Sequence, residues 1–408
     1  MKCKPLFLSL ALLLVLSSGY GQLASINKGV IDIRSVDLNH KRVILDGEWF
    51  YYPGELIDHH RSGHSQWIHF PQAWPKGQNY ASYSLQLIAL RGTKSLSIKL
   101  PQIYSSYQLF VNGELKGANG IIGKSKEESK PQWMPQTLSF QTDADTIEVT
   151  LAISNFHHHT GGVKESLYIG SSDLMYQHDR TSNVSNLSEA LTLLVLAVFF
   201  FVIYLLYDQK KITIYFSLLC LSWAIRSVFS NQYLFIQYVP DFDWTLMVKI
   251  EYITLYFTMM WAILFLSRLF ANEGNQVIKF IMVTAYCIFI GFTLFTEPII
   301  FTRWLNIYLI FAGLLLIYGV VIVMRALANE RIGAWYLTIS VILGLLIFAY
   351  DLSTFKGIFD YNAILFSSAY ILIFILMGLA LLYFLNIIKS KSKSATILRY
   401  EDFYNDAK

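Results

Sequence analysis

The stretch Leu187–Tyr207, LSEALTLLVLAVFFFVIYLLY, decides the fold, because it is the first of seven apolar runs that follow one another with only short polar connections. A mainly apolar run of about 18 residues or more can cross a bilayer as a helix, and hydrocarbon forces such a span to pair its backbone groups internally. Seven runs in succession therefore predict an all-α bundle of seven transmembrane helices over residues 187–388. The other six predicted spans are Ile212–Phe229, Leu246–Phe270, Ile278–Phe295, Trp304–Met324, Gly333–Tyr350 and Ile364–Ile387.

The lysines and arginines after residue 187 indicate how this bundle is oriented. If the preceding chain lies outside, eleven of them fall in inner loops and in the tail 389–408, and four fall on the outer side. Cytoplasmic segments of membrane proteins carry such an excess. The sequence thus predicts an exported segment before the bundle and a short cytoplasmic tail, 389–408, whose Lys389, Lys391 and Lys393 lie at the anionic inner leaflet.

The start of the chain has the features of an export signal. Lys2 and Lys4 precede the apolar run Pro5–Leu16, and small residues follow it. About a dozen apolar residues are too few to span a bilayer but suit a secretory signal peptide. We expect residues 1–21 to be such a peptide, cleaved near Gly21, with an uncleaved anchor as the alternative. The exported segment contains no cysteine, so no disulfide framework holds it.

Residues 22–180 replace long apolar runs with short segments in which apolar and polar residues alternate. Clear examples are Leu96–Leu100, Tyr107–Val111 and Ile147–Ile153. Such alternation predicts half-buried strands, and Asn112-Gly113 after one of them is a strong hairpin signal. Many short strands without intervening helices predict an all-β domain of the β-sandwich or jelly-roll type. Its fifteen Lys/Arg balance its fifteen Asp/Glu, which argues against a nucleic-acid partner.

Aromatic and amide side chains of this domain are candidates for ligand binding. An aromatic face can stack on a sugar ring while amides hold its hydroxyls, although most aromatics of a sandwich belong to its core. Trp74 is the leading candidate, since it lies between Pro71 and Pro75 in a loop-like stretch where a role in a buried strand does not explain it. The further candidates are Tyr80, Asn112, Asn155 and His157.

The histidines argue against a metal site and against catalysis in the membrane. His157, His158 and His159 are consecutive, and consecutive residues of an extended segment point to alternate faces, so the three cannot close on one ion unless the loop coils. We expect a solvated loop there, with no metal and no cofactor. All nine histidines precede residue 181, which removes Ser–His dyads and histidine zinc ligands from the spans. The chain is therefore not expected to be an enzyme.

A set of turns and aromatics in a fixed order resembles that of a known family. The matching residues are Gly47-Glu48-Trp49 with Tyr51-Tyr52, Pro71-Gln72-Ala73-Trp74, Ala81-Ser82-Tyr83, Leu100-Pro101-Gln102, Val111-Asn112-Gly113, Ser154-Asn155-Phe156 and Gly161-Gly162. Over nearly the whole mature chain the sequence resembles the bacterial seven-transmembrane receptors with diverse intracellular signalling modules. In that family an exported jelly-roll domain, similar to galactose-binding domains, precedes seven helices.

The resemblance implies a receptor in the bacterial cytoplasmic membrane that binds a small extracytoplasmic molecule, such as a carbohydrate, and relays its presence inward. Family members typically end in a kinase, a cyclase or a DNA-binding module, whereas only residues 389–408 follow the last run here. The implied output is therefore a separate cytoplasmic signalling protein. A non-signalling, membrane-anchored module that binds glycan or holds a complex is the alternative, with a transporter as a third possibility.

Ionisable residues within the spans are costly and are candidates for coupling the two domains. Arg226, near the outer end of the second span, and Glu251, near the outer end of the third, have similar predicted depths, and Asp351 lies at the same rim. We expect these three to form a polar cluster beneath the exported domain. The alternative is that each side chain reaches the outer interface separately.

Overall fold

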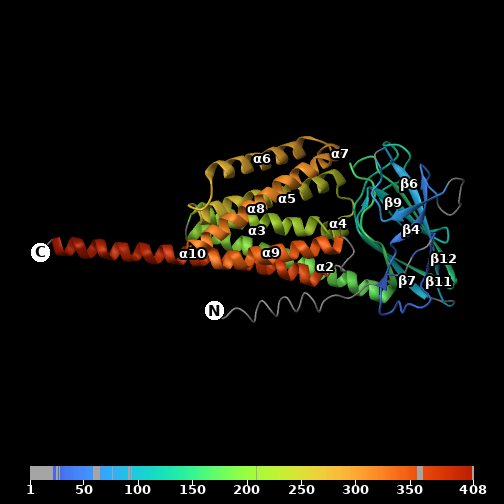
Figure 1. Cartoon of the computed structure of the whole chain (residues 1–408), viewed down its shortest axis with the longest axis horizontal. Coiled ribbons are helices and arrows are strands. Elements are labelled where there is room, and N and C mark those ends of the chain that lie inside the picture. The colour runs from blue at the N-terminus through green and yellow to red at the C-terminus, as the bar shows by residue number, and fades with distance from the viewer. Residues whose placement is uncertain are drawn as a thin grey trace.

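The computed structural model describes residues 22–23, 26, 28–57, 65–75, 77–90, 92, 94–207, 209–355 and 362–406, and for 22–23, 351–352, 355 and 387–406 it describes the backbone alone. A β domain forms one end of the molecule, and the helices extend from it along the long axis (Figure 1). The predicted signal peptide, residues 1–21, lies outside the described residues.

Short strands form the β domain, as the alternating segments predict. The strands are β1 (Gln22–Leu23), β2 (Val30–Asp32), β3 (Val43–Ile44), β4 (Gly47–Pro53), β5 (Gln66–Phe70), β6 (Tyr80–Ile88), β7 (Lys94–Leu100), β8 (Ile103–Tyr104), β9 (Ser106–Val111), β10 (Glu114–Asn119), β11 (Gln136–Thr142), β12 (Thr146–Ser154), β13 (Gly162–Val163) and β14 (Tyr168–Ser171).

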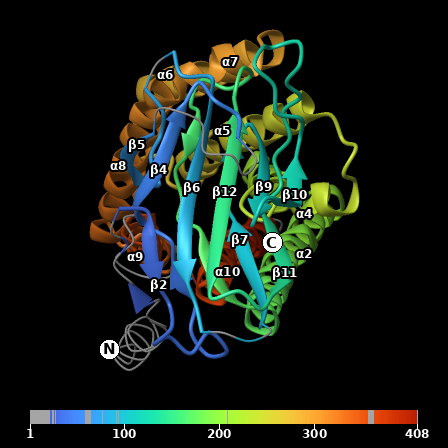
Figure 2. The ribbon, with the colours of Figure 1, turned by 90° about the vertical axis from the view of Figure 1, so that its right-hand side faces the viewer.

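Two facing sheets enclose the core of this domain. One has the order β1-β3-β14-β7-β11, and the other has the order β10-β9-β12-β6-β4-β5 with β2 added to β6. Figure 2 shows the second sheet in front of the helices. Apolar residues of both sheets, such as Tyr83 and Leu85 from one and Ile98 from the other, meet in a single buried cluster. The predicted sandwich is therefore confirmed.

The helical region follows without a break. Its elements are α2 (Ser172–Leu206), α3 (Lys211–Phe229), α4 (Leu234–Tyr238), α5 (Trp244–Leu269), α6 (Gln276–Phe295), α7 (Pro298–Phe301), the 3-10 turn η1 (Thr302–Trp304), α8 (Leu305–Ala328), α9 (Ala334–Phe355) and α10 (Ala363–Asp406). Within the described residues, six segments are long and apolar enough to cross a membrane, and the apolar part of α9, Ala334–Tyr350, is shorter. Together they account for the seven predicted spans.

The outer surface of the helices is apolar, as contact with lipid requires. Phe280, Phe295, Ile310 and Ile317 are among the large apolar side chains that remain exposed on α6 and α8. A protein in water rarely exposes so continuous an apolar surface. Basic residues gather instead at the helix ends farthest from the β domain (Figure 1), and these are Lys210, Lys211, Arg268, Lys279, Arg325 and Arg331.

The boundary between the domains differs from the prediction. Residues 172–180 were expected in the sandwich, but α2 begins at Ser172, directly after β14. Ser171 caps the helix by accepting a hydrogen bond from the backbone N–H of Leu174 at 3.4 Å. Residues 172–186 are mainly polar because they lie beside the sandwich and not in hydrocarbon, so hydropathy alone could not reveal this part of the helix.

The hairpin predicted at Asn112-Gly113 joins β9 to β10, and both of its central residues have positive φ angles, +50° and +80°. The Oδ1 atom of Asn112 also accepts a hydrogen bond from the backbone N–H of Glu148 at 2.8 Å. Asn tolerates this backbone conformation better than most residues with a Cβ atom. Asn112 thus has a structural role in the turn, although it was predicted as a ligand residue.

We expect Asn112→Ala to lower the stability of the β domain by about 1–2 kcal/mol, because alanine is strained at positive φ and cannot accept the hydrogen bond. Thermal unfolding of the full chain in nanodiscs measures this. Asn112→Gly loses the same hydrogen bond but is not strained at positive φ, so its loss of stability should be smaller. Equal stability of Asn112→Ala and the wild type would contradict the structural role.

Candidate functional site

Trp133 joins the β domain to the helices. It lies in the connection between β10 and β11, only 1% of its surface is exposed, and it belongs to the buried cluster of the helical bundle. Its indole makes an edge-to-face contact with Trp244, the first residue of α5, at a ring-centroid distance of 5.3 Å, and lies 6.3 Å from Tyr233. Tyr104 and His158 of the β domain pack on it from the other side, each at 5.2 Å.

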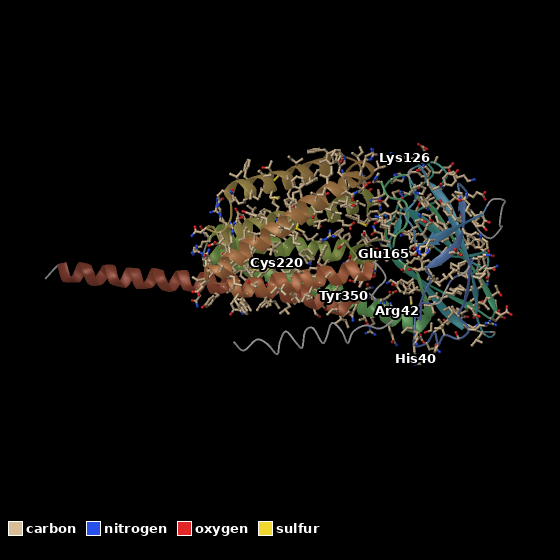
Figure 3. The ribbon with its side chains drawn as sticks, in the orientation of Figure 1. His40, Arg42, Lys126, Glu165, Cys220 and Tyr350 are labelled. Atoms are coloured by element: carbon tan, nitrogen blue, oxygen red, sulfur yellow. The ribbon has the colours of Figure 1, made fainter. Side chains whose placement is uncertain are left out.

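Hydrogen bonds surround this aromatic contact. The Nε2 atom of Gln132 donates to the backbone carbonyl of Pro240 at 2.8 Å, and the backbone N–H of His159 donates to the Oγ1 atom of Thr302 at 3.2 Å. We call this contact region, formed by residues 132–133 and 155–161 of the β domain and by residues 233–244 and 297–303 of the helical region, the seam. Figure 3 places Lys126 and Glu165 along the same boundary.

Helix α2 provides a second, covalent connection between the domains. Ser97 of β7 donates a hydrogen bond to the Oγ atom of Ser172 at 2.9 Å, and Lys99 of the same strand forms an ion pair with Asp179. The first turns of α2 are thereby attached to the sandwich, while the same continuous helix continues into the first span. A displacement of the sandwich relative to the bundle must therefore act on α2 as well.

A cleft of about 940 Å³ opens at the seam between the β domain and the connection from α6 to α8. Both domains contribute to its wall. The lining residues are Trp74, Pro75, Gly77, Gln78, Asn79, Asn155, Phe156, His158, His159, Thr160, Gly161, Ile299 and Arg303.

The loop 155–161 forms much of this wall and is held by Asn155. Its Oδ1 atom accepts a hydrogen bond from the backbone N–H of His158 at 3.0 Å, and its Nδ2 atom donates to the carbonyls of His158 and Thr160, both at 2.9 Å. Gly161 is needed here because a Cβ atom at this position would lie 2.7 Å from the ring of Trp74. The loop predicted to be solvated is therefore packed against both domains.

His158 is buried in this loop. Burial lowers its pKa to about 3, so its imidazole is neutral at physiological pH. Its Nδ1 atom lies 3.0 Å from both the backbone N–H and the carbonyl of Thr160, whereas its Nε2 atom has no hydrogen-bond partner among the described residues.

Only some of the five predicted ligand residues line the cleft. Trp74 and Asn155 line the cleft, whereas Tyr80, Asn112 and His157 are not among its lining residues. Trp74 lies in no strand, as expected, but it is only 9% exposed and donates from Nε1 to the hydroxyl of Tyr83 at 2.5 Å, so it also belongs to the core. His157 lies at the seam, where its Nε2 atom is 3.1 Å from the carbonyl of Ser129.

The predicted polar cluster is partly present. The Nη1 atom of Arg226 donates to the backbone carbonyl of Glu251 at 3.0 Å, and the hydroxyl of Tyr233 donates to the Glu251 carboxylate at 3.2 Å. The structure thus brings Arg226 and Glu251 together, but the hydrogen bond goes to a carbonyl and not to the carboxylate. The side chain of Asp351 lies outside the described residues.

Glu189 in the first span was not singled out from the sequence. Its buried carboxylate accepts hydrogen bonds from the Nε1 atom of Trp223 at 2.8 Å and from the hydroxyl of Ser227 at 3.2 Å, and so joins α2 to α3. The sequence could have indicated Glu189 as a contact between helices, because an acidic residue inside an apolar run needs polar partners.

The far end of the bundle has its own polar contact. Glu273, between α5 and α6, accepts hydrogen bonds from the Nε atom of Arg331 at 2.6 Å and from the Nδ2 atom of Asn329 at 2.8 Å. These contacts join the α5–α6 loop to the α8–α9 loop at the end farthest from the β domain. The Arg331 guanidinium lowers the pKa of Glu273.

Residues 191–385 match the family model described as 7TM diverse intracellular signalling. No curated protein matches the chain. Solved structures with some similarity include a β-galacturonidase from Eisenbergiella tayi bound to galacturonate, at 13% identity and a TM-score of 0.25, covering 34% of this chain and 26% of that one. A β-glucuronidase from Faecalibacterium prausnitzii has 12% identity and a TM-score of 0.26, with 32% of this chain and 31% of that one covered. This chain thus spans less than a third of these relatives, and at such TM-scores the similarity carries no functional argument.

We expect Trp133→Ala to destabilise the full chain by about 3–5 kcal/mol, because the substitution leaves a cavity among Trp244, Tyr233 and His158. Thermal unfolding in nanodiscs measures this loss, and hydrogen exchange should rise in residues 155–161. Trp67→Ala is the matched control, since Trp67 is 47% exposed on the β domain. If both substitutions had the same effect on exchange at the seam, Trp133 would not hold the domains together.

We expect Arg226→Ala to cost about 1.5–3 kcal/mol, because the substitution leaves the Glu251 carbonyl without its charged donor. Glu251→Gln keeps both the carbonyl and an oxygen that can accept from Tyr233, so its cost should be smaller. Expression and thermal stability in nanodiscs measure both. Exchanging the two residues, R226E with E251R, should not restore stability, and a restored double variant would favour a direct pairing of the two charges.

Proposed function

The helical domain of this chain belongs to the 7TM diverse intracellular signalling family, and from this premise we propose that the chain is a membrane receptor. In this proposal the β domain binds a small extracytoplasmic molecule, and the helices relay its presence to a cytoplasmic signalling protein. The chain acts by binding and not by catalysis.

One observation carries the proposal: the cleft at the seam is lined by residues of both domains, from Trp74 and Asn155 to Ile299 and Arg303. A ligand can shift a conformational equilibrium only by its difference in affinity for the two states. A molecule in this cleft contacts the sandwich and the outer end of the bundle together. Its affinity therefore depends on how the two domains sit against each other, which is the property that a relay needs.

The lining of the cleft is compatible with a carbohydrate or a similar polar molecule. Gln78 and Asn79 supply amide groups for hydroxyls, while Trp74 and Phe156 supply aromatic surface. A volume of about 940 Å³ is at the upper end of the range for small-molecule sites. We therefore propose a carbohydrate-sized ligand, with the other predicted residues, Tyr80, Asn112 and His157, acting on the fold and on the seam instead.

Two elements are suited to carry the relay. Helix α2 connects strand β14 to the first span, and Glu189 attaches this helix to α3. Helix α5 begins at Trp244 against Trp133, and Arg226 holds α3 to α5 about two turns of helix further along, at the Glu251 carbonyl. Changes at the seam would thus reach α3 along two paths, each of them a chain of packed side chains and hydrogen bonds.

The proposed orientation places the β domain outside a bacterial cytoplasmic membrane. The basic helix ends farthest from that domain then face the cytoplasm, in agreement with the excess of positive charge on inner loops. The loops joined by Glu273 and Arg331 lie at this end. They are the proposed contact surface for the signalling partner.

The proposal predicts a ligand effect that crosses the bundle. We would screen glucose, galactose, N-acetylglucosamine and glucuronate against the full chain in nanodiscs by thermal shift, and measure hydrogen exchange with each sugar that stabilises it. A ligand should slow exchange at residues 155–161 and also change it at residues 270–275 and 329–333. An effect confined to the seam would favour a non-signalling glycan-binding module, and transport of the sugar into liposomes would favour a transporter.

A further inference from the structure

The cleft at the seam has an unusual balance of charge. None of its lining residues is Asp or Glu, and Arg303 is the one formally charged residue among them within the described part of the chain. The β domain as a whole has equal numbers of acidic and basic residues. The absence of carboxylates from the wall is therefore a local property of the cleft.

Arg303 has no acidic side-chain partner among the described residues. It lies in the turn η1 and forms no ion pair with a carboxylate of the described residues. The acidic residue of the same connection, Glu297, points elsewhere and pairs with Lys126 at 3.4 Å. A guanidinium offers several N–H donors in a planar fork, which suits the two oxygens of a carboxylate or a phosphate.

His158 is a second polar residue among those that line the cleft. Its Nε2 atom is buried and has no hydrogen-bond partner among the described residues. Nδ1 lies 3.0 Å from both the N–H and the carbonyl of Thr160. In the tautomer in which Nδ1 accepts from this N–H, the proton of the neutral ring lies on Nε2, and the proposal uses this tautomer. A buried donor without a partner is unfavourable, and a ligand oxygen would satisfy it.

The remaining walls favour a molecule with an apolar or ring-shaped body. Trp74, Phe156 and Ile299 provide this surface. We propose that the cleft binds an anionic molecule through a carboxylate or phosphate group held by Arg303, with His158 as an additional donor and the aromatic walls against the body of the ligand. This inference rests on the proposed function, because it assumes that the cleft is the ligand site.

The same anionic chemistry has two sources. One is a soluble molecule from outside the membrane, such as a sugar acid or a sugar phosphate. The other is the headgroup of an anionic lipid, since Arg303 is followed by Trp304, which is 47% exposed at the outer end of the bundle where tryptophan commonly marks the membrane interface. Both sources require Arg303, so one set of variants tests them together.

The test compares probes that differ in charge. The full chain in phosphatidylcholine nanodiscs is titrated with glucose, with glucuronate, which differs from glucose by a carboxylate at C6, with glucose 6-phosphate and with inorganic phosphate. A second preparation contains phosphatidylglycerol and no added ligand. Dissociation constants come from calorimetry, and the melting temperature reports the effect of the lipid.

We expect glucuronate or glucose 6-phosphate to bind at least tenfold more tightly than glucose if the ligand is soluble, a difference of about 1.4 kcal/mol. If the ligand is a lipid, phosphatidylglycerol should raise the melting temperature and the sugars should not discriminate. In either case Arg303→Gln should abolish the preference for the anion, and Arg303→Lys should retain part of it. Arg180→Gln, at an exposed arginine of α2 outside the cleft, is the matched control and should change nothing.

Three results would overturn the inference. They are equal affinity for glucose and glucuronate together with no stabilisation by phosphatidylglycerol, an anion preference that survives Arg303→Gln, and the absence of any response to the sugar anions, phosphate and phosphatidylglycerol. The two proposals fail in different ways. If a neutral sugar binds and changes exchange at residues 270–275, the receptor proposal holds and the anion proposal fails. If an anion binds through Arg303 without that change, the anion proposal holds and the relay fails.

Discussion

The burial of Trp133 is the contact on which the arrangement of the two domains depends. The indole packs between the two domains, against Tyr233 and Trp244 of the helical region and against Tyr104 and His158 of the sandwich. A large aromatic side chain contributes a substantial apolar area and a preferred edge-to-face geometry. It therefore fixes both the distance and the angle between the sandwich and the bundle, which hydrogen bonds at an exposed rim could not do alone.

The other contacts at the seam depend on the burial of Trp133. Because Trp133 holds the sandwich on α5, the loop 155–161 lies against the α6–α8 connection, and the cleft between them has walls from two domains. Because α2 starts at Ser172, directly after β14, the first span cannot move independently of this strand. The polar groups within the bundle, Glu189 and Arg226, then lie in those parts of α2 and α3 that are nearer the β domain.

The difference between the predicted and observed roles of single residues follows from packing. Trp74 was predicted as a ligand residue because it lies in a loop-like stretch between prolines; it lines the cleft, but it also packs in the core and donates a hydrogen bond to Tyr83. Asn112 belongs to a strong hairpin signal, and its role in that turn explains the residue better than the predicted role in ligand binding. His158 was noted only as part of a histidine run in a loop expected to be solvated, and nothing in the sequence joined it to Arg303, since the two come from positions far apart in the chain and meet only at the seam.

The sequence by itself determined the class of each domain, because hydropathy period and run length report directly on whether a segment faces hydrocarbon or a half-buried sheet. It also determined the hairpin at Asn112-Gly113, where local backbone preference is decisive. Only the tertiary structure decided where the first helix starts, which oxygen Arg226 contacts and which residues share the cleft. The physical reason is that these features depend on contacts between elements distant in sequence, and their residue types are equally compatible with a solvated loop, a core position or a binding site.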